Sequence, residues 1–279
     1  MHFIFTVKTM KIEEINGLKI LKFENLCGES GLKHGVSTRC GGVSPEPYAS
    51  LNLGFGTADF SENVTENLTL FCEALGGAFE KTVRMRQAHT SNVRVIGPDL
   101  EFSDSAPSAI PDCDALVTNL KGVPLLALSA DCGLTVFYDP THSVLAVCHS
   151  GWRGAMLNIY AQVISVMKLR FGTAPADLIA GVSPMISAEN YPVKDDLLEK
   201  FRLFYPEDVT RECLIMKDGR HHFSLKDLLK HQLQELGVMN YEFAHMCTYA
   251  NKDLFYSWRR DGNRAGRFGL LASLVRTKD

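Results

Sequence analysis

Short apolar segments separated by turn residues fill the middle of the chain, and they restrict its fold more than any other feature. Runs of five to seven residues rich in Val, Leu and Thr are typical of β-strands. Strict alternation of strands with helices is absent, as are the GxGxxG and Walker glycine patterns, so a Rossmann sheet is not expected. The predicted strands are Leu18–Leu26, Val83–Gln87, Asn92–Ile96, Asp114–Asn119, Val123–Ser129, Leu134–Tyr138, Ser143–His149, Leu178–Val182, Tyr241–Thr248, Leu254–Trp258 and Phe268–Arg276.

Helical spacing of apolar residues is confined to a few segments. The predicted helices are Ser61–Gly76, Trp152–Phe171, Asp195–Tyr205 and a segment that begins at a capping box on Ser224 and ends at Gly237. The expected fold is therefore α+β, with mixed β-sheets flanked by helices. No repeat or linker divides the sequence, so residues 1–279 are predicted to form a single catalytic domain in which residues 1–17 are peripheral.

Composition excludes several classes of protein. Lys and Arg number 29 against 32 acidic residues, a balance that disfavours nucleic-acid binding and binding to anionic membranes. The longest apolar run, Val123–Tyr138, is interrupted by Asp131, so no membrane span is expected. The eight cysteines are scattered without a CxxC pair, and the N-terminus lacks a signal-peptide pattern. A cytoplasmic, reducing setting is predicted.

Polar groups that can bind a metal follow three of the predicted strands. His89 ends the segment Gln87-Ala-His89, Cys132 ends Ser129-Ala-Asp-Cys132, and His149 opens a segment that leads into a helix. Two imidazoles and a thiolate suit a zinc ion that keeps its fourth position open, as in catalytic sites. Asp131 interrupts an apolar run, so its carboxylate needs a partner or a function.

Each of these residues also has an ordinary structural interpretation. A lone His89 is typical of a hydrogen-bonded histidine, and Cys132 alone is typical of a small buried hydrophobe. Asp112-Cys113 is a second Asp-Cys pair, although it follows Pro111 in a predicted loop. The cluster of basic residues near the C-terminus is either functional or a solvated loop; it comprises Arg259, Arg260, Arg264 and Arg267.

A series of motifs along most of the chain resembles the YfiH-type laccase-domain family. The motifs are HGVSTRCGGVS with YASLNLG, Gln87 with His89, DALVT, ADC, HSGWRGA and FYSWRRDG followed by GR. The resemblance implies an α+β fold of mixed sheets flanked by helices, also similar to that of cysteine hydrolases. It implies purine nucleoside phosphorylase activity and zinc ligation by His89, Cys132 and His149.

Two departures from the family pattern concern the site. Thr90 stands where the family usually has Gly, and Gly181–Ser187 replaces a GPxIG-like turn, which puts substrate preference in question. The older family label, a multicopper polyphenol oxidase, needs many imidazoles, commonly as HxH pairs, whereas this chain has nine His and no HxH. Zinc is therefore the expected cofactor, with copper second. The H-x-E…P-C-x-x-C deaminase signature is also missing.

The function that the resemblance implies is zinc-dependent phosphorolysis of a purine nucleoside. Inosine, adenosine or methylthioadenosine would react with phosphate to give the free base and a sugar 1-phosphate, with adenosine deamination as a side activity. The expected partners are a nucleoside and phosphate, without nucleic acid or membrane, and the oligomeric state stays open.

Candidate roles follow from the chemistry of each side chain. Asp131, Cys132 and His149 are the predicted catalytic residues, with Asp131 as acid or base. Arg39 and Arg153 are candidate phosphate contacts because guanidinium groups bind phosphate bidentately, and a structural salt bridge is the alternative for each.

Further candidates and alternatives remain. Gln87 and Asn52 are candidates for contacts to ribose hydroxyls. A second hypothesis is a cysteine-type amide or ester hydrolase in which Cys132 is the nucleophile and His149 or His89 the base. A third is a non-enzymatic zinc-binding protein.

Overall fold

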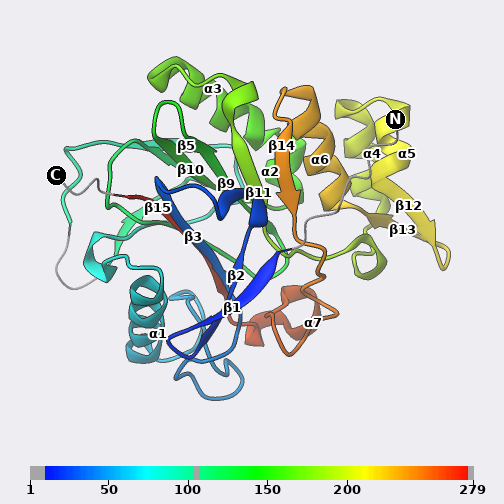
Figure 1. Ribbon diagram of the computed structural model, residues 1–279. Coiled ribbons are helices and arrows are strands. Elements are labelled where there is room, and N and C mark those ends of the chain that lie inside the picture. The colour runs from blue at the N-terminus through cyan, green and yellow to red at the C-terminus, as the bar shows by residue number, and fades with distance from the viewer. Residues whose placement is uncertain (1–9, 103–106, 276–279) are drawn as a thin grey trace, which may run out of the picture.

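The computed structural model describes residues 10–102 and 107–275 and consists of two mixed β-sheets between layers of helices (Figure 1). The first sheet has seven strands in the order β1 (Lys11–Ile15), β2 (Leu18–Lys22), β3 (Leu32–Ser37), β15 (Phe268–Leu274), β8 (Leu125–Ser129), β4 (Val83–Met85) and β6 (Ser108–Ile110). The second has six, in the order β14 (Asn240–Phe243), β11 (Ile179–Val182), β9 (Gly133–Asp139), β10 (Val144–Ser150), β7 (Ala115–Thr118) and β5 (Val93–Ile96).

The helices cover the outer faces of the two sheets. On the outer face of the first sheet lies α1 (Ser61–Ala74). The outer face of the second sheet is covered by α2 (Trp152–Met156), α3 (Ile159–Phe171) and α6 (Leu225–Glu235), and α4 (Asp195–Phe204) and α5 (Glu207–Cys213) pack beside α6 in the same apolar cluster. A hairpin of β12 (Leu214–Lys217) and β13 (Arg220–Phe223) and the short α7 (Trp258–Asp261) complete the named elements. The predicted α+β class is confirmed, with mixed sheets flanked by helices.

Alternation along the strands explains this layering. In β10, Val144, Ala146 and Cys148 pack against the helices. Leu145 and Val147 pack between the two sheets. Because successive side chains point to opposite faces of a strand, both faces of the central strands are buried and both carry apolar residues. No helix in residues 10–102 and 107–275 is long and apolar enough to cross a membrane.

Several predicted boundaries are wrong for identifiable reasons. The segment predicted as one helix, Trp152–Phe171, is two helices, because Asn158 adopts a left-handed φ of 50° and caps α3 by accepting a hydrogen bond from the Ala161 N–H. The predicted strand Leu254–Trp258 is a loop that leads into α7. In the segment Leu18–Leu26, the strand ends at Lys22 and a 3₁₀ turn follows.

The ends of the chain refine two further predictions. Residues 11–15, predicted as peripheral, form the edge strand β1, which pairs with β2 and is largely exposed. Residues 1–9 of that peripheral segment, and Arg276 at the end of the last predicted strand, lie outside the described residues. The elements β1, β3, β6, α5, β12, β13 and α7 were not predicted.

Strand directions bring three strand ends to one place. Strands β4 and β8 are parallel neighbours, with Val83 opposite Leu125, so both end at the same edge of the first sheet. At this edge β15 begins, with Phe268 opposite Ser129. The second sheet contributes the end of β10, where Ser150 pairs with Gly133. His89 and Cys132 follow β4 and β8, and His149 is the second-last residue of β10, so the three predicted metal ligands lie at these strand ends.

Candidate metal centre

Two imidazoles and a thiol meet where these strands end. The ligand atoms of His89, Cys132 and His149 all lie within 4.8 Å of one another, and Cys132 Sγ is 3.9 Å from His89 Nε2. His149 is buried, Cys132 is half-buried and His89 is exposed, so the cluster is closed on the protein side and accessible from the other. In the part of the chain that the structure describes, this is the only group of three such side chains near enough to share a metal ion.

A buried carboxylate, Asp114, orients both histidines. Its Oδ1 accepts hydrogen bonds from His149 Nδ1 at 2.8 Å and from the backbone N–H of His89 at 3.2 Å. Its Oδ2 accepts bonds from the backbone N–H of Thr90 at 2.7 Å, from the Thr90 hydroxyl at 2.9 Å and from the Ala88 N–H at 3.2 Å. These bonds hold His89 in a left-handed conformation with φ of 57°. Because the carboxylate accepts a hydrogen bond from Nδ1–H of His149, the neutral ring keeps the lone pair of Nε2 for a metal.

The charges around the cluster favour an ionised thiol. Burial raises the pKa of Cys132. The two histidines, His149 and His89, lower it to about 6, because each brings a positive charge and a hydrogen bond to the thiolate. Burial lowers the pKa of His149, while Cys132 and Asp114 together raise it to about 9. In the metal-free protein, Cys132 and His149 therefore form a thiolate–imidazolium pair at neutral pH. A metal ion that binds both must release the imidazolium proton.

The donor set fits zinc. Tetrahedral zinc with Zn–S near 2.3 Å and Zn–N near 2.0–2.1 Å separates its ligand atoms by roughly 3.3–3.6 Å. The distance of 3.9 Å between Cys132 Sγ and His89 Nε2 is a few tenths of an ångström longer and needs only a small movement of the exposed His89 side chain. Three protein ligands leave the fourth position for a water or a substrate atom, the arrangement of catalytic zinc.

Asp131 holds the turn that presents Cys132. Its backbone has a φ of 106°, which L-residues adopt at a cost of about 1–3 kcal/mol. The carboxylate compensates by accepting bonds from the Thr248 hydroxyl at 2.6 Å and from the Arg259 N–H at 2.7 Å, while the Asp131 carbonyl accepts from the Ile186 N–H. With both carboxylate oxygens engaged, these contacts favour a positioning role over that of an acid or base.

The cluster opens into a cavity of about 800 Å³, within the usual size range of sites for small molecules. Aromatic side chains from four separate segments line it: Phe55, Trp152, Tyr191 and Trp258. Five arginines also line it: Arg84, Arg86, Arg153, Arg259 and Arg267. Asp131 is the one carboxylate among the lining residues. The cavity therefore combines flat apolar surfaces with a large excess of positive charge.

Two predicted substrate contacts lie elsewhere. Arg39 does not line the cavity: its Nε donates to the Ala49 carbonyl, its Nη1 donates to the Lys252 carbonyl, and its guanidinium stacks on Tyr256. Asn52 is buried in the loop between β3 and α1, where its carboxamide bonds to Thr57, Asp59 and the backbone N–H groups of Gly54 and Arg267. Both side chains stabilise the loop rather than face a substrate.

Two other predicted contacts do line the cavity. Gln87 is largely committed to the sheet, since its amide NH₂ donates to the Leu128 carbonyl at 2.7 Å and its oxygen accepts from the Leu128 N–H at 2.9 Å. Arg153 is exposed, and its guanidinium lies 4.5 Å from the centre of the Trp152 ring. Arg153 therefore stays a candidate for phosphate, whereas Gln87 serves chiefly to fix β4 to β8.

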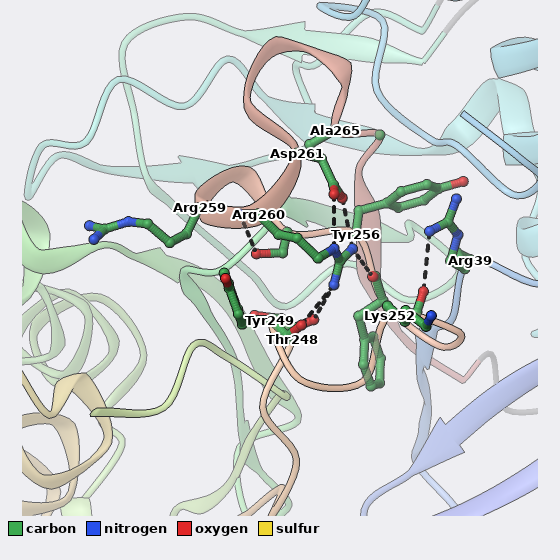
Figure 2. A network of polar contacts seen from close by, with 12 residues as sticks. Arg39, Thr248, Tyr249, Lys252, Tyr256, Arg259, Arg260, Asp261 and Ala265 are labelled. Atoms are coloured by element: carbon green, nitrogen blue, oxygen red, sulfur yellow. Dashed lines mark hydrogen bonds and ion pairs between the residues drawn. The ribbon is translucent and has the colours of Figure 1, made fainter. Parts of the chain in front are cut away.

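The C-terminal basic cluster divides into structural and cavity residues (Figure 2). The guanidinium of Arg260 donates to the carbonyls of Thr248, Tyr249 and Phe255 and pairs with Asp261, which ties the segments around α7 together. The Arg259 side chain extends away from this network, and its guanidinium lies 4.8 Å from the Tyr191 ring centre. The interpretation as a solvated loop is thus wrong for Arg259 and Arg267, which line the cavity.

Sequence reasoning missed Asp114, Arg84 in β4 and Arg86 directly after it. Asp114 opens the DALVT strand, and the rule that a buried carboxylate needs a partner, which singled out Asp131, applies to it equally. Arg84 and Arg86 are two residues apart in a predicted strand, so their shared face could have been recognised. Nothing local in the sequence marked Tyr191 as a cavity residue.

The sequence matches a family model described as multi-copper polyphenol oxidoreductase laccase over residues 33–275. The chain belongs to this laccase family. It is 33% identical to a protein named purine nucleoside phosphorylase from Bacteroides thetaiotaomicron, over 89% of this chain and 94% of that protein. The predicted family membership is confirmed.

Two solved structures show the same fold. The crystal structure of the hypothetical protein YfiH from Bacillus licheniformis superposes with a TM-score of 0.84 at 27% identity, over 92% of this chain and 96% of that one. The crystal structure of YlmD from Geobacillus stearothermophilus superposes with a TM-score of 0.85 at 25% identity, over 95% and 98% of the two chains.

Substitution of the shared carboxylate tests how far the site depends on it. Asp114→Asn removes the charge and places an amide NH₂ against N–H donors, so the metal affinity is expected to fall roughly tenfold to a hundredfold. Competition with a chromophoric zinc chelator measures it. Asp112→Asn is the matched control, because Asp112 is exposed and asparagine tolerates its left-handed φ of 49°. Equal affinity in both variants would contradict the orienting role.

Proposed function

We propose that this protein is a zinc-dependent purine nucleoside phosphorylase. The observation that carries the proposal is the joining, in one cavity, of a His-Cys-His metal cluster with five arginines and four aromatic side chains. Aromatic faces suit a purine, and guanidinium groups suit phosphate. The name of the Bacteroides thetaiotaomicron relative supports the same reaction class.

The proposed reaction exchanges one bond at the anomeric carbon. The C1′–N9 bond of inosine or adenosine breaks with its electron pair moving to the base, a phosphate oxygen bonds to C1′, and the base gains a proton. The products are the free base and ribose 1-phosphate. Methylthioadenosine, which shares the same bond, is a further proposed substrate.

The chain's own residues bind and orient the reactants in this scheme. A zinc ion held by His89, Cys132 and His149 would act as a Lewis acid that polarises a substrate atom or water. The aromatic rings hold the base, and the arginines neutralise the phosphate and orient it toward C1′. Asp131 keeps Cys132 in place through its bonds to Thr248 and Arg259.

Product analysis with and without phosphate tests the proposal. Inosine and adenosine are each expected to yield free base and ribose 1-phosphate at a rate that depends on the phosphate concentration. Equal base release in phosphate-free buffer, with free ribose as the product, would replace phosphorolysis by hydrolysis at the same site. Ammonia release from adenosine measures the proposed deaminase side activity separately.

The thiolate–imidazolium pair favours a second candidate, a cysteine-type hydrolase with Cys132 as nucleophile and His149 or His89 as base. Such an enzyme would be indifferent to phosphate. It would also need a free thiolate, whereas a thiolate bound to zinc is not free to attack. A non-enzymatic zinc-binding protein, the third candidate, would show neither reaction.

Alkylation of Cys132 separates the metal site from the nucleophile. Because the pKa of Cys132 is about 6, its thiolate persists above that pH. In metal-free protein, the rate at which iodoacetamide labels Cys132 should therefore be low at acidic pH and should increase with pH, with a midpoint near pH 6. Peptide mass spectrometry measures it, with Cys113, whose pKa burial raises to about 11, as the internal control. Zinc should protect Cys132; equal labelling of the zinc-saturated protein would favour the hydrolase.

A further inference from the structure

Three of the cavity arginines, Arg84, Arg86 and Arg267, form what we call the arginine wall. Arg84 lies on the face of β4 opposite Val83 and Met85, which pack between the sheets. Arg86 follows two residues later on that same face. Arg267 comes directly before β15, where the adjacent Phe268 pairs with Ser129. The arginine wall is thus built on strand ends of the first sheet.

Hydrogen-bond donors of the arginine wall lack partners within the described residues. The Nε of Arg84 is buried and makes no hydrogen bond. The Arg86 side chain is exposed and forms neither a hydrogen bond nor an ion pair with the described part of the chain. Arg267 uses Nη1 for the carbonyls of Ala265 and Gly266, which leaves its other N–H groups available. Guanidinium donors left this way call for an acceptor that enters from the cavity.

Aromatic rings fix the planes of two of these guanidinium groups. The Arg84 guanidinium lies 5.1 Å from the centre of the Phe55 ring, and that of Arg267 lies 5.4 Å from the Trp258 ring centre. Gly54, directly before Phe55, packs tightly on Arg267, since a Cβ on Gly54 would come within 2.6 Å of Arg267 Cγ. Stacking holds the planar groups and leaves their edges free for bidentate hydrogen bonds.

The charge of the cavity shows which kind of ligand fits. Among the described residues, none of the five lining arginines forms an ion pair, and the carboxylate of Asp131 is saturated by Thr248 and the Arg259 N–H. Burial, followed by the neighbouring charge of Arg86, lowers the pKa of Arg84, as expected for a cation without a counter-ion. A ligand with at least two negative charges would relieve this repulsion, and a phosphate group carries them near neutral pH.

We infer that Arg84, Arg86 and Arg267 form a phosphate subsite separate from the metal ligands, an inference that rests on the proposed phosphorolysis. The bound group is either inorganic phosphate, as co-substrate, or the phosphate ester of a nucleotide, since both present the same oxygens. The aromatic residues Phe55 and Trp258 brace the guanidinium groups, and Arg153 lies outside the subsite.

Titration calorimetry of the zinc-loaded protein with inorganic phosphate tests this subsite. Arg86→Met and Arg84→Met are each expected to weaken phosphate binding roughly tenfold to a hundredfold. Arg86 is exposed, so its replacement leaves the packing intact. Arg84→Lys keeps the positive charge but lacks the paired N–H donors of a guanidinium group, and it is expected to retain part of the phosphate affinity that Arg84→Met loses. Arg170→Met, at an exposed position near the end of α3, is the matched control and should bind phosphate as the wild type does.

Two added ligands identify the source of the phosphate group. Adenosine that binds together with phosphate identifies inorganic phosphate as the ligand. AMP that binds more tightly than adenosine to the wild type, and loses this advantage in Arg86→Met, identifies a phosphate ester. Either result supports the subsite.

Unchanged phosphate affinity in both Arg84→Met and Arg86→Met, or a loss only in Arg153→Met, would overturn the inference. Phosphorolysis with an unaltered KM for phosphate in the first two variants would refute the subsite and leave the proposed function standing. Phosphate binding that depends on Arg84 and Arg86, without any phosphorolysis, would support the subsite and refute the proposed function.

Discussion

Cys132→Ala is expected to lower the zinc content of the purified protein from about one ion per chain to near zero, and to abolish phosphorolysis with it. The thiolate supplies the one anionic ligand of the cluster, and the remaining imidazoles of His89 and His149 bind a divalent ion too weakly to retain it through dialysis. Elemental analysis after dialysis, normalised to protein concentration, measures the result.

Cys113→Ala is the matched control for this experiment. Cys113 belongs to the second Asp-Cys pair, is buried between the sheets and lies outside the cluster. Its replacement should retain the metal and cost about 1 kcal/mol of stability. Loss of zinc from Cys113→Ala, with retention by Cys132→Ala, would show that the other Asp-Cys pair holds the metal.

Gly151→Ala is expected to disrupt the metal site without altering a ligand. A Cβ at this position would lie 2.9 Å from Cys132 Sγ and 3.0 Å from His89 Cδ2, so both ligands must move. The Gly151 backbone, with φ of −86°, accommodates alanine, which confines the effect to the ligands. Zinc affinity should fall roughly a hundredfold or more, since metal sites tolerate displacements of only about 0.5 Å.

Chelator competition measures that loss, and the melting temperature of the metal-free protein shows that the fold is retained. Gly97→Ala is the matched control, because a Cβ there meets no atom within 4 Å. If Gly151→Ala bound zinc as tightly as Gly97→Ala, the ligands would have to adopt a different arrangement in the loaded protein.

The positions of the metal ligands could be predicted because polar residues that end apolar strands are conspicuous. Cys132 and His149 come at the ends of largely buried runs, His89 follows the short strand β4 by a few residues, and the directions of β4, β8 and β10 bring these ends together. The strands of the middle of the chain were predictable for the same reason, since their apolar residues pack on both faces.

The substrate contacts were harder to predict because the same residue types also stabilise loops. Arg39 and Asn52 lie in a loop dense in Gly, Ser and Pro, where backbone carbonyls and N–H groups need partners, and these two side chains supply them. Which arginine faces a cavity depends on the packing of distant segments. The contacts of Arg84 with Phe55 and of Arg267 with Trp258 join separate segments of the folded chain, and no local sequence pattern marks them.

The departure from the family pattern at Thr90 has a local explanation. Its hydroxyl donates to Asp114 Oδ2 at 2.9 Å, which adds one bond to a carboxylate that already accepts from backbone N–H groups. Thr90 therefore adds to the support of the site and leaves the ligand set unchanged.

Because one carboxylate, Asp114, anchors His149 through its ring and His89 through its backbone, the protein orders the His149 imidazole and the backbone that carries the His89 imidazole as it folds. An arriving ion then meets a rigid template, and little conformational entropy remains to be lost on binding. The metal should accordingly exchange without unfolding of the chain. Such a template favours an ion whose preferred geometry matches the positions in which Asp114 holds the ligands.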